Sequence, residues 1–333
     1  MPVPAPLALT LGDPAGIGPE LALAAWLKRG EHDLSPFFVC GGMRALQEAG
    51  AHCGIDIPIA AIDAPADAAS RFAEALPVLS GKDCRYAPGS PDETGALVAR
   101  ASLEQGTRLA RDGAAGAVVT GPVSKAHLAT TGFAFPGQTE FLADAAGLEA
   151  SDVAMMIAGP SLRTVPLTIH VALADVPARL TTQLIVSRGR IVAQALVRDF
   201  GIAEPRIAVA GLNPHAGEDG AFGDEEARII EPAIAMLAAD GLSVSGPHPA
   251  DALFAPRARA TYDAALCMYH DQALVPVKAL DFDRGVNVTL GLPFIRTAPD
   301  HGTAFAIAGR RIADPGATIA ALKMAGDMAA RRA

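Results

Sequence analysis

The chain has 333 residues, of which 50% are hydrophobic and 19% are charged, and its 33 Gly and 26 Pro provide many turns. This composition fits a compact α/β protein of one large or two modest domains and excludes a disordered or fibrous chain. The net charge of −9 argues against a nucleic-acid-binding protein, which needs a basic surface to neutralise phosphates. An anionic ligand must therefore meet positive charge that is placed locally.

The cysteines are scattered and contain no C-x-x-C pair, which predicts reduced thiols rather than disulfides or a thiolate metal site. No uninterrupted apolar run approaches the roughly 18 residues of a membrane-spanning helix, and the N-terminus lacks the basic start of a signal peptide. We therefore expect a cytoplasmic protein without a membrane segment or a nucleic-acid partner.

Apolar runs of strand length alternate with longer segments of helical periodicity. The expected strands are residues 7–11, 37–40, 117–120, 153–157, 164–171, 206–210, 264–269 and 286–290. The expected helices are residues 19–28, 92–111, 125–130, 139–146, 182–200, 225–239 and 315–332. This alternation predicts a largely parallel sheet flanked by helices, with ligands at the carboxyl ends of the strands.

Two Gly/Pro-rich points are the best candidates for crossings between domains. One is directly after Thr120, and the other is the stretch 291–299. Such crossings predict one lobe of residues 1–122 with 296–333 and a second lobe of residues 123–295.

The opening segment, residues 9–20, has the pattern of a strand, a glycine loop and a helix with Pro in its first turn. Gly12, Gly16 and Gly18 let the backbone approach a ligand closely, and a helix N-terminus favours negative charge. The spacing is not G-x-G-x-x-G and no P-loop Lys-Ser/Thr follows. Spacing alone leaves a ligand-binding loop and a plain tight turn equally open.

Two later segments also run from a strand end or loop into a helix. In residues 120–125, Ser124 and Lys125 are candidates for binding phosphate or carboxylate, and an N-cap serine beside a solvated lysine is the alternative. In residues 136–140, Gln138 and Thr139 are polar at a helix start, and Thr139 is equally suited to be an N-cap.

His170, His215 and His270 each end a hydrophobic run that is typical of a strand. A single such histidine is more often structural, but three at one topological level predict a divalent-metal site with positions open for substrate. Asp271 is a candidate to orient His270, with a helix cap as its alternative.

Three more polar residues, Lys278, Asn287 and Arg296, surround the strand expected at 286–290. Such groups suit the binding of a small anion, although each alone is most simply a surface residue. The set points to an enzyme.

Read in order, these segments resemble the 4-hydroxythreonine-4-phosphate dehydrogenase family of vitamin B6 biosynthesis. The stretches that carry the resemblance are GDPAGIGPE at 12–20, TGPVSK at 120–125, GQTEF at 137–141, GLNPHAGE at 211–218, YHDQ at 269–272, GVNVTLGLP at 285–293 and RTAPDHGTA at 296–304. They cover nearly the whole chain, and NPHAGE and YHDQ are quite specific.

The glycine loop and residues 301–309 are also similar to segments of isopropylmalate and isocitrate dehydrogenases. This wider resemblance implies a two-lobed α/β/α fold with a central cleft rather than a Rossmann domain. It implies that the loop of His301, Gly302 and Thr303 binds the adenosine half of NAD or NADP. Asp300, Arg310 and Arg311 lie near that loop, but the sequence leaves the preference between the two nucleotides open.

The family resemblance implies a role for each polar candidate. His170, His215 and His270 would hold one divalent cation per subunit, Zn, Mg or Co, in a site completed across a homodimer interface. The implied substrate contacts are Gln138, Thr139, Lys278, Asn287 and Arg296. Lys278 is the preferred proton-transfer residue, with an electrostatic anchor as its alternative. Gln138 departs from the histidine that the family commonly has there, so it can alter one substrate contact or the choice of substrate.

The implied reaction is the NAD(P)-dependent oxidation of 4-phosphooxy-L-threonine to a β-keto acid. That acid decarboxylates to 3-amino-2-oxopropyl phosphate on the way to pyridoxal 5'-phosphate. The alternatives are a related dehydrogenase acting on D-threonate or erythronate 4-phosphate or on a dihydrodiol and, from another class, a metal-dependent phosphate-ester hydrolase or binding protein.

Overall fold

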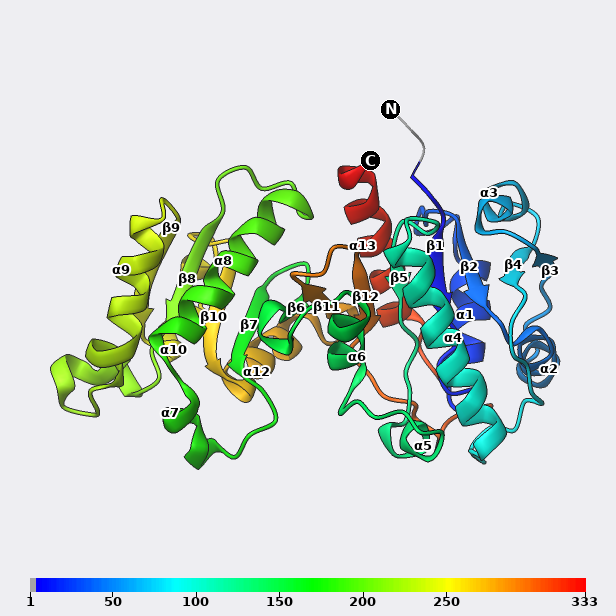
Figure 1. Cartoon of the computed structure of the whole chain (residues 1–333), viewed down its shortest axis with the longest axis horizontal. Helices are drawn as coiled ribbons and strands as arrows, with labels where there is room; N and C mark the ends of the chain where they lie inside the picture. The colour runs from blue at the N-terminus through cyan, green and yellow to red at the C-terminus, as the bar shows by residue number, and fades with distance from the viewer. Residues whose placement is uncertain (1–3) are drawn as a thin grey trace. The chain divides into compact units, whose positions relative to one another are not determined.

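The computed structural model describes residues 4–333, and the chain divides into two compact α/β units. The first comprises Met1–Ala150 and Leu292–Ala333, and the second comprises Ser151–Gly291. Each unit is a sheet with helices packed on it (Figure 1). The α/β fold class predicted from the sequence is confirmed.

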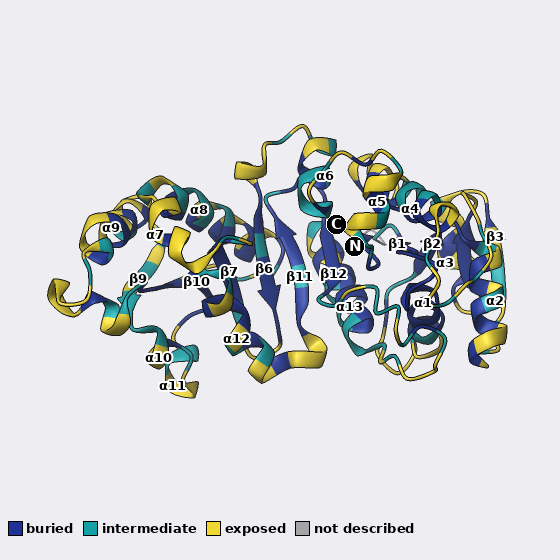
Figure 2. Cartoon of the chain, turned by 90° about the horizontal axis from the view of Figure 1, so that it is seen from below, coloured by how far each residue is buried: buried dark blue, intermediate teal, exposed yellow. Residues whose placement is uncertain are grey.

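The sheet of the first unit is parallel, in the order β3-β4-β2-β1-β5-β12. Its strands are β1 (Leu7–Thr10), β2 (Phe37–Cys40), β3 (Ile59–Ile62), β4 (Leu76–Leu79), β5 (Val118–Val119) and β12 (Arg296–Pro299). The central strands β1 and β2 are buried along their whole length, as expected of a parallel sheet covered on both faces (Figure 2).

The helices of this unit cover both faces of its sheet, with α4 on one face and α1 and α13 on the other (Figure 2). They are α1 (Gly18–Leu27), α2 (Met43–Cys53), α3 (Ala68–Arg71), α4 (Glu93–Arg111), α5 (Lys125–Thr130), α6 (Gln138–Ala145) and α13 (Gly316–Arg332). The start of α4 is fixed by Asp92, whose carboxylate accepts the Gly95 backbone N–H at 2.7 Å.

Residues 123–150 lie in the first unit, whereas the sequence predicts them in the second lobe. Phe133, Phe135 and Phe141 pack edge-on or tilted against one another, with ring centroids 5.3–5.5 Å apart. This aromatic group joins Leu103 of α4 and Leu128 of α5 in one cluster. Apolar burial therefore ties the segment to α4, and glycine and proline content does not reveal this.

The sheet of the second unit is mixed, in the order β11-β6-β7-β10-β8-β9. Its strands are β6 (Ala154–Ala158), β7 (Arg163–Thr168), β8 (Arg206–Ala210), β9 (Ser243–His248), β10 (Ala264–Tyr269) and β11 (Val286–Leu290). Strand β6 is antiparallel to both of its neighbours, and β7, β10, β8 and β9 are parallel. The prediction of a largely parallel sheet holds for both units.

Helix α12 covers the face of this sheet opposite α8 and α9 (Figure 2). The helices of the unit are α7 (Val176–Arg179), α8 (Thr182–Arg198), α9 (Glu231–Ala239), α10 (Ala250–Leu253), α11 (Pro256–Arg259) and α12 (His270–Asp281). A π-helical turn, Glu226–Ile230, leads into α9. No helix within residues 4–333 is long and apolar enough to cross a bilayer.

The expected strands and helices are all present, with ends shifted by a few residues. The sequence does not predict α2, α12, the short helices α3, α7, α10 and α11, the edge strands β3 and β9, or the strands β4 and β12. Strand β9 contains Gly246-Pro247 and β12 begins with Arg296 and ends with Pro299, so neither has a continuous apolar run. Helix α12 begins with His270-Asp271 and contains Pro276, which obscures its periodicity.

Candidate active site

The three predicted metal-ligand histidines come after three neighbouring parallel strands of the second unit. Strand β10 lies between β7 and β8, and its Leu266 is in register with Val165 and with Val209. The carboxyl ends of the three strands therefore meet at one edge of this sheet. His270 follows β10 directly, His170 comes shortly after β7, and His215 lies in the loop after β8.

The backbone carrying two of these histidines adopts a conformation that L-residues rarely take. His170 has φ 52° and His215 has φ 51°, and Glu218 and Asp219 are also in the left-handed region. Each such residue costs about 1–3 kcal/mol, and this kind of strain is concentrated at functional sites. The strain therefore supports a functional role for this edge.

The structure brings two of the three imidazoles together. The ring centroids of His170 and His270 lie 5.8 Å apart. Asp271 Oδ1 is 2.7 Å from His270 Nδ1, which is the orienting contact expected of Asp271. The ring of His215 instead has its Nδ1 3.1 Å from Glu218 Oε2. Among residues 4–333, no group of three or more His, Cys, Asp or Glu side chains is arranged to hold a metal ion.

Two buried polar residues that the sequence analysis missed shape this edge. Glu226 accepts the backbone N–H groups of Leu212 and Asn213, each at 2.8 Å. Gln272 accepts the Met268 N–H at 2.6 Å and donates to the Gly211 carbonyl at 2.8 Å. Glu226 thereby fixes the loop of His215, and Gln272 joins the ends of β8 and β10.

Lys278 and Asn287, two expected substrate contacts, also belong to the second unit. Lys278 is half-buried on α12, the helix that begins at His270. Asn287 is half-buried on β11, opposite Ile157 of β6. Both therefore belong to the same unit as the histidines, Asn287 in its sheet and Lys278 on a helix that covers the sheet.

The predicted glycine loop of the first unit is built by close backbone approach. Gly12 has φ 73°, and a Cβ there would lie 2.6 Å from the Pro122 carbonyl oxygen. A Cβ on Gly16 would lie 2.6 Å from the Thr303 carbonyl oxygen, which also accepts the Ile17 N–H at 3.0 Å. Neither glycine tolerates a side chain, and the loop lies against the predicted adenosine loop.

The predicted adenosine loop ends in contacts that hold it to α1 and α2. Glu20, only 4% exposed, accepts the Gly309 N–H at 3.3 Å, and Arg311 donates to the His52 carbonyl at 2.6 Å. Within the described chain, His301 Nε2 is buried without a hydrogen-bond partner. This imidazole nitrogen fits a ligand that supplies the missing hydrogen bond.

A buried carboxylate that the sequence analysis also missed joins the glycine loop to α5. Asp13 is 2% exposed; its Oδ1 accepts the Ala15 N–H at 3.1 Å, and its Oδ2 is 3.5 Å from His127 Nδ1. Burial raises the pKa of Asp13, and the Ala15 hydrogen bond and His127 oppose that rise. The ring of His127 in turn packs on Phe305 at 5.5 Å.

The remaining substrate candidates meet where α6 begins. The N-cap of α6 is Gly137, so the alternative in which Thr139 is only an N-cap is wrong. Ser124 does cap α5, accepting the His127 N–H at 3.4 Å. Arg296, only 5% exposed, donates to Thr120 and to Gln138. Burial lowers its pKa to about 10.

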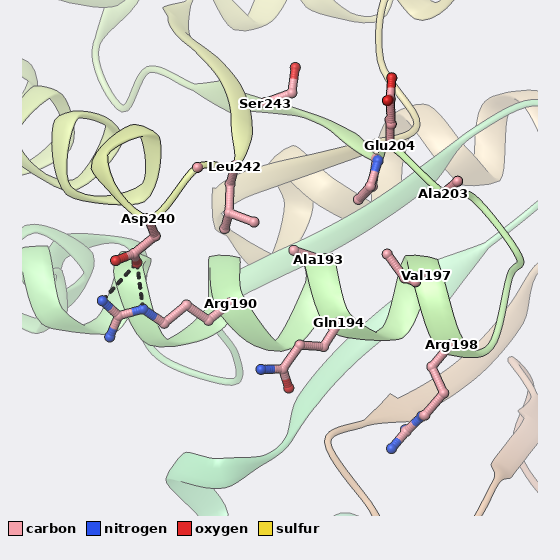
Figure 3. A pocket seen from close by; sticks show the side chains of 12 residues that line it. Arg190, Ala193, Gln194, Val197, Arg198, Ala203, Glu204, Asp240, Leu242 and Ser243 are labelled. Carbon is pink, nitrogen blue, oxygen red and sulfur yellow. Dashed lines mark hydrogen bonds and ion pairs between the residues drawn. The ribbon is translucent and has the colours of Figure 1, made fainter.

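A pocket of 920 Å³ in the second unit contains none of the predicted site residues (Figure 3). It lies between α8 and the segment around Asp240 and Ser243. Both of its arginines have ion-pair partners, since Arg190 pairs with Asp240 at 2.7 Å and Arg198 with Asp199 at 2.9 Å. The predicted site residues therefore lie at the sheet edge, the glycine loop and the start of α6, outside this pocket.

Two α/β units, one with histidines at strand ends and one with paired glycine and histidine loops, define an enzyme of the two-lobed α/β dehydrogenase type. The model of the family described as pyridoxal phosphate biosynthetic protein PdxA matches residues 33–325. A curated relative, 4-hydroxythreonine-4-phosphate dehydrogenase of Erythrobacter litoralis, is 62% identical over 98% of both chains. The chain belongs to this family, and it is an oxidoreductase.

Solved structures agree with this assignment. The 4-hydroxythreonine-4-phosphate dehydrogenase of Klebsiella pneumoniae is similar with a TM-score of 0.86, at 35% identity over 98% of both chains. A terephthalate 1,2-cis-dihydrodiol dehydrogenase of Burkholderia xenovorans is similar with a TM-score of 0.68, at 30% identity over 97% of this chain and 98% of that one. The resemblance inferred from the sequence motifs is confirmed.

Proposed function

We propose that this enzyme oxidises 4-phosphooxy-L-threonine with NAD(P)⁺ and a divalent metal, as a step of pyridoxal 5'-phosphate biosynthesis. The observation that carries the proposal is the 62% identity, across nearly the entire chain, to a relative named for this substrate. The oxidised product is a β-keto acid, which loses carbon dioxide to give 3-amino-2-oxopropyl phosphate.

We assign the cation to His170, His215 and His270. Of the implied ions Zn, Co and Mg, neutral imidazoles from three adjacent strand ends suit Zn and Co best, because Mg prefers oxygen ligands; the 5.8 Å separation of two rings supports a shared ligand. When bound, the cation supplies Lewis acidity to the substrate hydroxyl and NAD(P)⁺ supplies the hydride acceptor. The contact of His215 Nδ1 with Glu218 leaves Nε2 of this ring for the third position.

The other assigned residues hold the substrate and the nucleotide. Arg296 and Lys278 are the cations, and Thr139 and Asn287 the neutral hydrogen-bonding groups, for the substrate's phosphate and carboxylate. Lys278 is our candidate to move the hydroxyl proton. The nucleotide residues are Gly12, Gly16, Gly18, His301, Gly302 and Thr303, and the buried, orphaned Nε2 of His301 supports this choice.

The proposal includes a homodimer that shares the active site, in the cytoplasm. Support for the dimer comes from large apolar side chains that are exposed in the segments bearing the histidines. Leu173, Phe222 and Val275 are 68%, 51% and 63% exposed. Exposed apolar side chains near the proposed metal site are what we expect if a second subunit covers them.

A second candidate substrate class is a cyclic dihydrodiol, favoured by the similarity to the dihydrodiol dehydrogenase of Burkholderia xenovorans. The same metal and nucleotide sites would serve it, with different contacts in place of the phosphate. Gln138 is the position to examine, because its neutral amide places less positive charge near the substrate than a protonated histidine would.

The test is a substrate panel with the purified protein, both nucleotides and several metals, followed by NAD(P)H absorbance. We expect NAD(P)H formation with 4-phosphooxy-L-threonine at a kcat/KM at least about tenfold above that for threonate 4-phosphate or a dihydrodiol. No absorbance change with any of the substrates would contradict a dehydrogenase. If Gln138→His leaves the ratio of kcat/KM values unchanged, this residue does not determine specificity.

A further inference from the structure

We infer that Asp281 is a positioning residue, whose buried carboxylate holds the last turn of α12 to the turn between β6 and β7 and thereby fixes the place of Lys278. Lys278 is a substrate contact under the proposed function, on which this inference therefore rests. Asp281 itself lies outside the proposed metal, substrate and nucleotide sites. Its role in the reaction is exerted through Lys278.

The position of Asp281 on its helix is unusual for a charged residue. The side of α12 that covers the sheet carries the buried residues of the helix, at helical spacing. Asp281 is one of them and is 4% exposed, so a carboxylate stands where the pattern favours an apolar side chain. A buried carboxylate is costly unless it is hydrogen-bonded, and its partners therefore show what it holds.

The partner of Asp281 is Ser161, in the turn that joins β6 to β7. The Ser161 N–H donates to Asp281 Oδ2 at 2.8 Å, and the Ser161 hydroxyl donates to Oδ1 at 3.0 Å. The turn is closed by the Gly159 N–H, which donates to the Leu162 carbonyl at 2.9 Å, and Arg259 donates to the Ser161 carbonyl at 3.1 Å. We call the paired contact of Asp281 with Ser161 the clasp.

Gly159 shows how closely this turn approaches α12. A Cβ on Gly159 would overlap the Asp281 carboxylate and would lie 2.7 Å from the Asp281 Cβ. The turn also adjoins the start of β11, since Val286 is opposite Ala158, the last residue of β6. The clasp therefore ties the end of α12 to a point that strand pairing already fixes.

Other contacts hold the first turn of α12. Gln272 accepts the Met268 N–H at 2.6 Å and donates to the Gly211 carbonyl at 2.8 Å. Thr164 Oγ1 of β7 donates to the Ala273 carbonyl at 3.0 Å. The helix start, which begins at the proposed metal ligand, is thus anchored without the clasp.

Lys278 lies in the part of α12 that these contacts do not reach. Pro276 separates it from the anchored first turn, and a proline inside a helix removes one backbone hydrogen bond. Asp281 follows Lys278 by three residues, which is about one helical turn. The clasp is therefore the nearest polar anchor to Lys278 along the helix.

The experiment compares three variants of the whole protein with the wild type. Asp281→Ala removes the clasp, and Gly159→Ala displaces it without removing a polar group. Asp281→Asn keeps an oxygen for the Ser161 N–H and supplies an amide N–H to the Ser161 hydroxyl. The matched control is Asp283→Ala, which removes an exposed carboxylate two residues further along the chain.

Steady-state kinetics with 4-phosphooxy-L-threonine give the first readout. We expect kcat/KM to fall at least about tenfold in Asp281→Ala and Gly159→Ala, because misplacing a substrate contact by about 1 Å can cost about a hundredfold. A fall in kcat indicates that Lys278 moves a proton, and a rise in KM indicates that it is an anchor. Asp281→Asn and Asp283→Ala should stay within about threefold of wild type.

Two affinities separate positioning from a general loss of structure. Zn²⁺ affinity and KM for the nucleotide should stay within about twofold of wild type in Asp281→Ala, because other contacts hold the start of α12 and the nucleotide loops. A residue needed only for stability would lower Tm and leave the kinetics of the folded enzyme unchanged. If Asp281→Ala does not fold, Gly159→Ala carries the same test.

The variant Lys278→Ala identifies the residue through which Asp281 acts. In that background, Asp281→Ala should lower kcat/KM by no more than about twofold, because the side chain that the clasp places is gone. A further loss of about tenfold would show that Asp281 acts elsewhere, and it would overturn the inference.

Hydrogen exchange followed by mass spectrometry tests the clasp without a substrate. Asp281→Ala should speed amide exchange in residues 277–286 at least about tenfold and leave residues 264–274 within about twofold. Unchanged exchange in residues 277–286 would overturn the inference, as would wild-type kcat/KM in both Asp281→Ala and Gly159→Ala. A loss in Asp281→Asn as large as in Asp281→Ala would also overturn it, since charge and not the clasp would then matter. Failure of the proposed function is distinct, because the wild type then forms no NAD(P)H while exchange still decides whether the clasp holds the segment of Lys278.

Discussion

Glu226 offers a test of how the loop of His215 is held, because this single buried carboxylate, 3% exposed, serves several donors. Its Oε1 accepts two backbone N–H groups at 2.8 Å, and its Oε2 accepts Asn213 Nδ2 at 2.9 Å. The change Glu226→Ala leaves the two backbone donors without that acceptor. At about 1–2 kcal/mol for each, the free energy of unfolding should fall by about 2–4 kcal/mol.

The assay is thermal and urea unfolding followed by circular dichroism, with Zn²⁺ affinity measured in parallel. A loss of about 2–4 kcal/mol predicts a Tm lower by about 5–15 °C for a unit of this size. Zn²⁺ binding should also weaken, because the loop that presents His215 is no longer fixed. The control is Glu231→Ala, an exposed position on α9, which should change stability by at most about 0.5 kcal/mol. A Glu226→Ala protein with wild-type Tm and Zn²⁺ affinity would refute the reasoning.

Three further predictions concern the two loops and the buried cation. Gly12→Ala should destabilise the protein by about 2 kcal/mol or more and raise KM for the nucleotide. The reason is that Gly12 has φ 73° and that a Cβ there would lie 2.6 Å from a carbonyl oxygen. A wild-type Tm for this variant would contradict the prediction. Burial lowers the pKa of Arg296 to about 10, so the guanidinium is charged below that pH and neutral above it. Binding of inorganic sulfate, measured by calorimetry, should therefore persist to about pH 9 and fall above about pH 10, and a flat profile to about pH 11 would show that Arg296 is not the cation involved. His215→Ala should lower the bound metal, measured by elemental analysis, at least about tenfold, and full occupancy would remove His215 from the metal site.

Sequence patterns predicted the elements with the strongest periodicity. The buried strands β1, β2 and β10 have continuous apolar runs, and the long helices α4 and α8 have an N-cap and an amphipathic pattern. The three strand-end histidines were predicted by the same logic, since neighbouring parallel strands place the residues at their carboxyl ends along one edge of the sheet.

The rest depended on contacts that are distant in sequence. Glu226 and Gln272 look like ordinary helix residues, and only the fold shows that they are buried against the loops of β8 and β10. The one indication of their burial in the sequence is that a charged or amide side chain stands at a position where the pattern of buried residues would place an apolar one. The assignment of residues 123–150 to the first unit likewise depended on aromatic packing around Phe133.

The most direct measurement is NAD(P)H formation from 4-phosphooxy-L-threonine by the wild-type enzyme after exhaustive chelation and again after a divalent metal is restored. If the imidazoles at 170, 215 and 270 hold the cation needed for oxidation, chelation abolishes turnover and the metal restores it. Turnover that is unchanged in the fully chelated enzyme would contradict the central claim.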